Sequence, residues 1–459
     1  MLLNSINPTS GKKLPGVKIS TQSDIKSSVA AAKKAYLYWK NLALSQRLKY
    51  VKKFLFIFEK QKNDLAKLES EEMGKPYQYA KIHLESDNRY LRYYLENSQK
   101  ILSPEIIEKK QKLVRQIIRQ PLGVSAVITP WNFPYTLAIW GIIPNLICGN
   151  TVVYKPSELT PLCGAKIMKI FEKAGFPKGV VNIVQGDGKV GKALIEQDID
   201  FVWFTGSSAT GQKIYEKCGQ KFIRCLLELG GSSPAIVFDD VDIKKTAQEI
   251  FAARFSNCGQ ICSSVKRLFI HRKIFKSFLK ELINITNNAK VGDPFDNNTT
   301  IGPLVSKRQL QVLEMQVADA VKNGAVIETG GRRPKGSKFK NGFYYLPTVL
   351  TNVNFKMKVL NEEVFGPVLP VVVFNSLSEA VELANNTEYG LTALVYTSNK
   401  KVSKHLADNI QAGVISINTK NYSFPNSPFG GWKKSGMGVE GNKFGFHEMT
   451  RVKYICSLK

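Results

Sequence analysis

Residues 124–154 read VSAVITPWNFPYTLAIWGIIPNLICGNTVVY and place an apolar segment of helical length between two short segments rich in β-branched residues. The segments at 124–129 and 151–154 have the length of buried strands, and residues 136–148 have the length of a helix. This order predicts a parallel strand–helix–strand unit in which the helix crosses over the sheet.

The alternation of strands and helices continues after this segment. Strands are expected at 180–184, 201–204, 226–229 and 235–238, and helices at 161–174, 190–197 and 208–218. Strands and helices that alternate at this spacing predict an α/β fold built on a doubly wound parallel sheet, which binds its ligands beyond the carboxyl ends of the strands.

Two further regions flank the predicted sheet. Residues 23–98 carry apolar side chains at helical spacing, and residues 113–119 alternate basic and β-branched residues as an exposed strand does. Because single hydrophobic cores stop growing near ~250–300 residues, a chain of 459 residues is expected to hold a second unit. This α/β unit follows residue 242, with strands at 267–271, 370–374, 392–396 and 414–418 and helices at 242–254, 273–289, 306–323 and 377–386.

The chain carries 65 Lys+Arg against 37 Asp+Glu, a formal net charge of +28. Two interpretations are open, an anionic partner such as nucleic acid and a surface that is simply rich in lysine. No block of five basic residues occurs, which favours the second interpretation. The most apolar stretch, 137–143, is far shorter than the ~20 residues of a membrane span, and no signal peptide precedes it. We therefore expect a cytoplasmic protein with neither a membrane nor a nucleic-acid partner.

The cysteines suggest reactive thiols rather than bridges. Their number, seven, is odd and no CxxC pair occurs, so we expect neither a disulfide framework nor a metal site. Cys258 and Cys262 flank a Gly-Gln turn just beyond an expected helix. Backbone N–H groups at such a boundary would lower the pKa of a thiol and make it a nucleophile. The alternative is that a cysteine here is a small buried apolar residue.

Other segments carry further candidate chemistry. Glu228 lies in an apolar strand, where desolvation would raise its pKa and suit it to general-base work, unless it pairs with a lysine. Asn132 lies in the rigid turn Pro-Trp-Asn-Phe-Pro, which would aim its amide at a developing oxyanion. Glycine-rich turns at 186–191 and 204–211 each join a strand to a helix and would suit a phosphate. The pattern alone does not choose between them, and either is also compatible with a simple tight turn.

Taken together, these segments resemble the aldehyde dehydrogenase superfamily, and overall most of all its succinate-semialdehyde dehydrogenase group. The matches cover nearly the whole chain in the family's order, and they are Pro-Trp-Asn-Phe-Pro (130–134), Lys-Pro-Ser-Glu (155–158), Phe-Thr-Gly-Ser (204–207), Glu-Leu-Gly-Gly (228–231), Gly-Gln-Ile-Cys (259–262), Glu-Glu-Val-Phe-Gly-Pro (362–367) and Ser-Pro-Phe-Gly-Gly (427–431). The resemblance implies a homodimer or homotetramer of three-part subunits. These parts are a Rossmann-type cofactor domain (1–98 and 122–230), a catalytic domain (231–445) and a β oligomerisation segment (99–121 and 446–459).

The resemblance also implies an activity, the NAD(P)-dependent oxidation of an aldehyde to a carboxylic acid. Cys262 would attack the aldehyde, the Asn132 amide would hold the oxyanion, and Glu228 would activate the water that hydrolyses the thioester. The pyrophosphate would lie at Gly206 and Ser207 rather than at 186–191. The residues expected to hold the cofactor are Trp131, Lys155, Glu158, Gly206, Ser207, Gly211, Glu363 and Phe365. A carboxylate at Glu158 would repel a 2′-phosphate, which favours NAD over NADP.

The substrate is where the resemblance and the pocket disagree. The pocket is expected to include Phe133, Trp140, Ser256 and Phe424. Succinate-semialdehyde enzymes bind the substrate carboxylate with arginine, commonly at the position of Trp140 and in some members at that of Ser256. Overall similarity therefore favours succinic semialdehyde, whereas the aromatic pocket favours apolar aliphatic or aromatic aldehydes.

Two other classes compete with this interpretation. A basic scaffold without activity would bind anionic polymers through the net charge alone. A CoA-acylating enzyme would share the fold, but its members generally lack the base that Glu228 provides.

Overall fold

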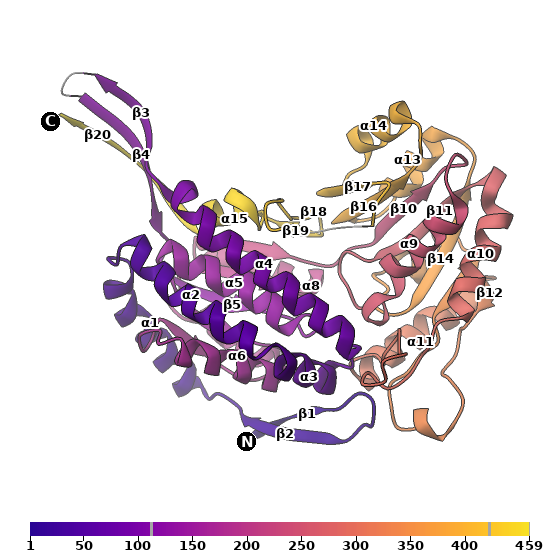
Figure 1. The fold of residues 1–459 in the computed structure, drawn as a ribbon, viewed down its shortest axis with the longest axis horizontal. Helices are drawn as coiled ribbons and strands as arrows, with labels where there is room; N and C mark the ends of the chain where they lie inside the picture. Colours follow the sequence, from indigo (N-terminus) through magenta and orange to yellow (C-terminus); the bar gives the residue numbers. More distant parts are fainter. Residues whose placement is uncertain (111–112, 421–423, 459) are drawn as a thin grey trace.

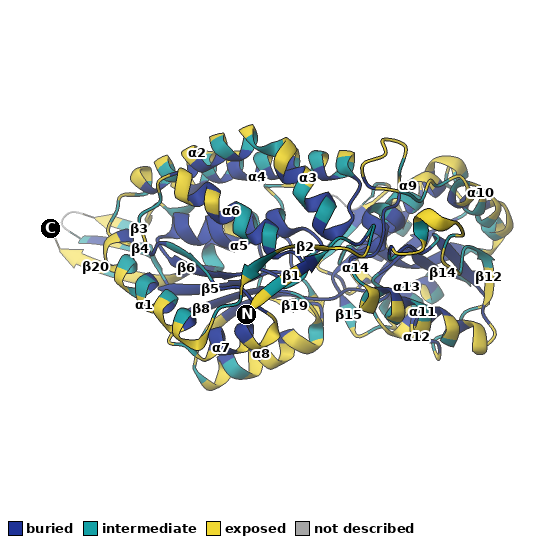
Figure 2. Cartoon of the chain, turned by 90° about the horizontal axis from the view of Figure 1, so that it is seen from below, coloured by how far each residue is buried: buried dark blue, intermediate teal, exposed yellow. Residues whose placement is uncertain are grey.

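The computed structural model describes residues 1–110, 113–420 and 424–458. Two α/β lobes lie side by side, and a three-stranded ribbon projects from the first of them (Figure 1). The sheets run through the buried interior of both lobes, whereas two strands of the projecting ribbon carry mostly exposed residues (Figure 2). No helix of the described ranges is both long and apolar enough to cross a bilayer.

The first lobe is built on a six-stranded sheet with the order β19-β9-β8-β5-β6-β7, in which β5 to β9 run parallel. This confirms the expected doubly wound sheet. The strands are β5 (Val124–Ile128), β6 (Thr151–Lys155), β7 (Val181–Ile183), β8 (Phe201–Thr205), β9 (Arg224–Glu228) and β19 (Gly436–Met437). The helices between the parallel strands are α5 (Pro134–Cys148), α6 (Pro161–Lys173), α7 (Gly188–Glu196) and α8 (Ser208–Gln220).

Helix α5 is apolar on all sides because it is buried on all sides. Pro134 occupies its first position, where its missing N–H costs nothing, and Gly149 ends it with φ = +96°. Between them, buried residues line both the sheet side and the side toward the N-terminal helices. The helix therefore forms the centre of the first lobe's core.

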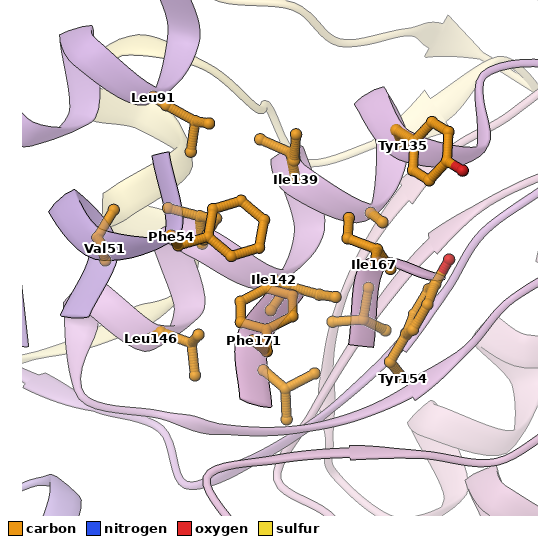
Figure 3. Close-up of a cluster of buried hydrophobic side chains, with 14 of the residues drawn as sticks. Val51, Phe54, Leu91, Tyr135, Ile139, Ile142, Leu146, Tyr154, Ile167 and Phe171 are labelled. Atoms are coloured by element: carbon orange, nitrogen blue, oxygen red, sulfur yellow. The ribbon is translucent and has the colours of Figure 1, made fainter. Parts of the chain in front are cut away.

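Four N-terminal helices form, as the pattern at 23–98 predicts; the last three cover this core, and the first packs against β6 and α7. They are α1 (Gln22–Trp39), α2 (Leu44–Lys60), α3 (Lys62–Met73) and α4 (Tyr77–Leu102). Figure 3 shows the packing: Phe54 of α2 meets Phe171 of α6 at a ring distance of 4.4 Å, and Ile142 of α5 lies beside them. A hairpin of β1 (Leu2–Ile6) and β2 (Lys13–Lys18) precedes the helices.

The second lobe holds a seven-stranded sheet with the order β12-β13-β14-β11-β10-β16-β17. Its strands are β10 (Ser233–Val237), β11 (Val265–His271), β12 (Val326–Thr329), β13 (Thr348–Thr351), β14 (Val368–Phe374), β16 (Thr392–Tyr396) and β17 (Val414–Ile417). Its α-helices are α9 (Ile243–Phe255), α10 (Phe275–Asn287), α11 (Lys307–Lys322), α12 (Lys358–Asn361), α13 (Leu377–Asn385) and α14 (Lys400–Asn409).

Several of these elements leave too weak a pattern in the sequence to be predicted from it. Helix α14 is polar and buries one residue, Leu406, so it carries little periodic signal. Strand β12 lies at the edge of its sheet and is largely exposed. Short elements that depend on tertiary pairing leave a weak pattern in the sequence.

The projecting ribbon has the order β20-β4-β3. Its strands are β3 (Glu105–Lys110), β4 (Leu113–Pro121) and β20 (Thr450–Leu458), so the exposed strand expected at 113–119 lies within β4. The remaining short elements are η1 (Ser256–Gly259), η2 (Arg272–Ile274), η3 (Ser337–Phe339), β15 (Tyr389–Gly390), β18 (Trp432–Lys433) and α15 (Asn442–Glu448).

The two large sheets meet at a short connection. Glu228 is the last residue of β9 in one sheet, and Ser233 is the first residue of β10 in the other. Gly436 and Met437 return to pair with β9 beside Glu228, although the boundary expected from the sequence assigned them to the second unit. The candidate site lies at this junction.

Candidate active site

The segment 256–262, which we call the nucleophile loop, begins with an unusual backbone conformation. Asn257, Cys258 and Gly259 are consecutive residues with φ of 53°, 57° and 71°, in the left-handed region. A side chain on Gly259 would place Cβ 2.3 Å from the carbonyl oxygen of Gly366, so only glycine fits. The turn separates the two candidate thiols: Cys258 is 1% exposed in the core, whereas Cys262 is partly exposed.

The nucleophile loop is tied to the turn that carries Asn132. The Asn132 side-chain amide donates to the carbonyl of Gln260 at 3.1 Å, and the Asn257 amide donates to the carbonyl of Asn132 at 3.3 Å. Gln260 in turn donates to the carbonyl of Asn257 at 3.0 Å and accepts from the N–H of Val305 at 2.9 Å. Sequence reasoning missed Asn257 and Gln260, and their presence in the same short segment as Cys262 was the available signal.

The pKa of Cys262 corrects one expectation. We predicted that the loop would lower it, but burial raises the pKa of Cys262 to about 12. Lys266 acts in the opposite direction, while Glu363 and Glu228 raise the pKa further. Desolvation of the thiolate outweighs the one favourable charge.

Glu228 fits the environment expected of a general base. It is 3% exposed, and burial raises the pKa of its carboxyl well above the ordinary value. Neither of its carboxyl oxygens has a hydrogen-bond partner within the described part of the chain, which leaves both for a ligand or water. A second buried carboxyl, Glu440, raises the Glu228 pKa further, and its own pKa is raised to about 8 by burial. Glu440 carried no local sequence signal.

The two glycine-rich turns differ in what caps the helix that follows. Helix α7 begins behind Asp187, whose carboxylate accepts from the N–H of Lys189 at 2.9 Å. Helix α8 begins behind Ser207, a neutral cap that accepts from the N–H of Thr210. Because an anion already sits at the start of α7, a phosphate is better accommodated at α8.

The residues expected around the adenine ribose lie together at the end of β6. Lys155 is 4% exposed and donates to the carbonyl of Pro156 at 2.8 Å. Its Nζ lies 3.6 Å from the Glu158 carboxylate, which is partly exposed. Burial lowers the pKa of Lys155, and Glu158 counteracts that effect.

A second group of expected cofactor residues borders Cys262. Glu363 accepts from the N–H of Gly231 at 3.2 Å and from Lys266 Nζ at 2.9 Å. Lys266 also donates to the carbonyl of Cys262 at 2.7 Å. The Trp131 and Phe365 rings meet edge to face with centroids 5.5 Å apart. Lys266 was missed, although a lone lysine at the start of an apolar strand was a visible signal.

Trp140 lies in an aromatic environment. Its ring is 4.7 Å from that of Tyr90 and 6.4 Å from that of Phe429. Together with Tyr94, Ser427, Glu440 and Gly441, these three residues line a small cavity. An aromatic side chain thus occupies the position at which a carboxylate-binding arginine would be expected.

The other expected pocket residues have separate surroundings. Phe133 packs against His83 at a ring distance of 4.8 Å, and Ser256 hydrogen-bonds to Tyr79. Phe424 is 52% exposed on a turn closed by Ser427.

Arg254 does not supply a substitute for the missing arginine. It is fully buried, and its guanidinium donates to Ser264 at 3.1 Å and to the carbonyl of Val364 at 3.0 Å. It also donates to the carbonyl of Gly366.

In the described ranges, no group of three or more His, Cys, Asp and Glu side chains is arranged to hold a metal ion.

Comparison with known proteins gives a consistent result. The chain is 38% identical to betaine aldehyde dehydrogenase of Bacillus subtilis (strain 168) over 98% of its own length and 93% of the relative. It is 34% identical to mitochondrial succinate-semialdehyde dehydrogenase of Oryza sativa subsp. japonica, covering 98% and 85%. The structure of betaine aldehyde dehydrogenase from Staphylococcus aureus in complex with NAD+ superimposes with a TM-score of 0.96 at 32% identity, covering 100% and 91%. The sequence profile of the aldehyde dehydrogenase family matches residues 2–455, and the chain therefore belongs to that family.

Proposed function

We propose that this protein oxidises an aldehyde to a carboxylic acid, with Cys262 as nucleophile and NAD as hydride acceptor. The observation that carries the proposal is the junction of the two sheets. There a partly exposed thiol, a fixed amide and a buried glutamate with two unpartnered oxygens come together.

The chemistry follows from these three groups. The Cys262 thiol loses its proton to solvent, and the thiolate sulfur bonds to the carbonyl carbon. The carbonyl oxygen becomes an oxyanion held by an Asn132 N–H and the Cys262 backbone N–H. NAD, when bound, accepts the hydride that leaves this carbon. A thioester then remains on Cys262. Glu228 takes a proton from water, the resulting hydroxide attacks the thioester carbon, and the carboxylic acid leaves as the Cys262 sulfur departs.

We propose that the cofactor lies along the residues named above. Its pyrophosphate would lie at Gly206, Ser207 and Gly211, where α8 starts behind a neutral cap. Its adenine ribose would lie at Lys155 and Glu158. A carboxylate at Glu158 disfavours the additional phosphate of NADP. Glu158→Ser should therefore relax the preference for NAD, and an unaltered ratio of kcat/KM for the two cofactors would show that Glu158 does not set it.

For the substrate, we propose an aldehyde whose far end is uncharged or cationic rather than a carboxylate. The cavity beside Trp140 is lined by three further rings and by Glu440. Aromatic faces bind apolar groups and cations, whereas the described residues that line the cavity include no Lys or Arg to pair with a carboxylate. The relatives include both a betaine aldehyde and a succinate-semialdehyde enzyme, so similarity alone does not select the substrate.

Initial rates of NADH formation with betaine aldehyde, hexanal and succinic semialdehyde test this proposal. Either of the first two should give a higher kcat/KM than succinic semialdehyde. Trp140→Arg should raise relative activity toward succinic semialdehyde. A wild-type preference for succinic semialdehyde would mean that an unassigned basic residue holds its carboxylate.

We further propose that the projecting ribbon (β3, β4 and β20) mediates homo-oligomerisation. Four apolar side chains on this ribbon are more than half exposed, namely those of Ile106, Ile107, Val452 and Tyr454. An exposed apolar surface of this kind is typical of a protein–protein interface. We also propose that the chain divides into a cofactor domain (1–98 and 122–230), a catalytic domain (231–445) and an oligomerisation segment (99–121 and 446–459). The seven free thiols support a reducing compartment such as the cytoplasm.

A further inference from the structure

Lys266, near the start of β11, is a fully buried lysine. Burial lowers the pKa of its ammonium group, and Glu363 and Cys262 counteract that effect. Its Nζ donates to the Cys262 carbonyl at 2.7 Å and to Oε1 of Glu363 at 2.9 Å, and it lies 5.6 Å from the centre of the Phe365 ring. Burying an ammonium group is costly unless it is paired and hydrogen-bonded, and these contacts meet that need. The same ammonium group thus joins the nucleophile loop to Glu363, one of the residues proposed to hold the cofactor.

The charges around Cys262 are unevenly distributed. Three carboxyl groups act on it, Glu363 from the segment before β14, Glu228 from β9 and Glu440 from the segment before α15. Lys266 is the cation that acts on it from within the described residues. Arg254 acts on Lys266 and Glu363, but its guanidinium is held by Ser264 and by two carbonyls. Forming a thiolate at Cys262 adds a negative charge that Lys266 is placed to stabilise.

We propose that Lys266 is a positioning residue that holds the nucleophile loop against Glu363 and supplies the positive charge for the Cys262 thiolate. The proposal rests on the proposed function only for the role of Cys262 as nucleophile. Ionisation of the thiol is measurable without aldehyde or cofactor. Absence of aldehyde oxidation by the wild-type protein would therefore overturn the proposed function and leave this measurement intact.

The test is alkylation of Cys262 by iodoacetamide in the full-length protein, followed by peptide mass spectrometry across about pH 6 to 10. The thiolate sulfur bonds to the acetamide carbon, iodide leaves and the thiol proton goes to solvent. Because the pKa of Cys262 is about 12, the whole pH range lies below it. In Lys266→Met alkylation should therefore be about tenfold slower at each pH, as expected for a rise of about one unit in that pKa. Lys266→Arg, which keeps the charge, should restore most of the rate.

Two further variants separate charge from packing. Glu363→Gln removes a carboxylate that opposes the thiolate, so its alkylation should be faster than wild type, the opposite sign to Lys266→Met. Lys75→Met removes another fully buried lysine, paired with Glu69, and should lower the thermal midpoint without shifting the alkylation curve. An alkylation rate in Lys266→Met equal to that of the wild type would overturn the proposal. Equal slowing of alkylation in Lys266→Met, Glu363→Gln and Lys75→Met would also overturn it. If Lys266→Met does not fold, slower alkylation in Glu363→Gln than in wild type would overturn it.

Discussion

The side-chain amide of Asn132 donates to the backbone carbonyl of Gln260 at 3.1 Å, two residues before Cys262. An amide nitrogen carries two protons, so this bond orients the second one for a ligand. Asn132→Ala should lower kcat by roughly 10²–10³, the usual effect of losing one oxyanion donor. Steady-state kinetics checks this, and Cys262 alkylation serves as the control because the thiol should remain reactive. A kcat near the wild-type value would contradict the role of Asn132.

The two thiols of the nucleophile loop should respond differently to removal. Cys262→Ala should abolish aldehyde turnover while NAD still binds, since the sulfur forms the intermediate but does not hold the cofactor. Cys258→Ala is the matched control, because that side chain is buried in the core and away from the chemistry. Initial rates and NAD titration by fluorescence distinguish the two. Turnover by Cys262→Ala would refute the mechanism.

Replacing Glu228 should slow the second half of the reaction. Glu228→Gln keeps the size of the side chain but cannot take a proton from water, so hydrolysis of the thioester should be slowed more than hydride transfer. Stopped-flow measurement of NADH should show a burst of about one equivalent per active site followed by a slow steady rate. A steady rate equal to that of the wild type would count against the base role.

Glu440 should make the folded protein less stable as the pH rises. Burial raises its folded pKa from the ordinary 4.5 to about 8, so between these values the folded state binds more protons than the unfolded state. The free energy of unfolding then falls with increasing pH, by up to about 1.4 kcal/mol per pH unit for one group. Glu440→Gln should reduce the decline of the thermal midpoint between about pH 5 and 8. An unchanged slope would show that Glu440 is not responsible.

The left-handed turn before Cys262 should tolerate only glycine at position 259. Gly259→Ala would combine φ = +71° with a 2.3 Å contact to the Gly366 carbonyl, so it should cost at least about 1–3 kcal/mol of stability. Gly219→Ala in α8 is the matched control. A side chain there meets no atom within 4 Å, and alanine should stabilise that helix by about 0.5–1 kcal/mol. Equal thermal midpoints for the two variants would contradict the strain argument.

The sequence by itself determined much of the architecture and indicated the candidate reactive groups. The strand–helix alternation after Val124 and the apolar face of α2 at Val51, Phe54 and Phe58 are local periodicities, so they can be seen in the chain alone. The residue types at Cys262, Asn132 and Glu228 sit in recognisable local segments. Their chemistry could therefore be assigned before any contact was known.

The tertiary structure alone decided how these groups behave. The raised pKa of Cys262 depends on burial and on three carboxyl groups from distant segments, none of which can be judged from the loop itself. Glu440 reaches the site because the C-terminal segment returns beside β9, and Lys266 because β11 passes behind the nucleophile loop. Desolvation and charge interactions depend on distance in space rather than along the chain. The sequence therefore indicated which side chains are candidates for the chemistry, whereas the folded structure determined the pKa values of those side chains.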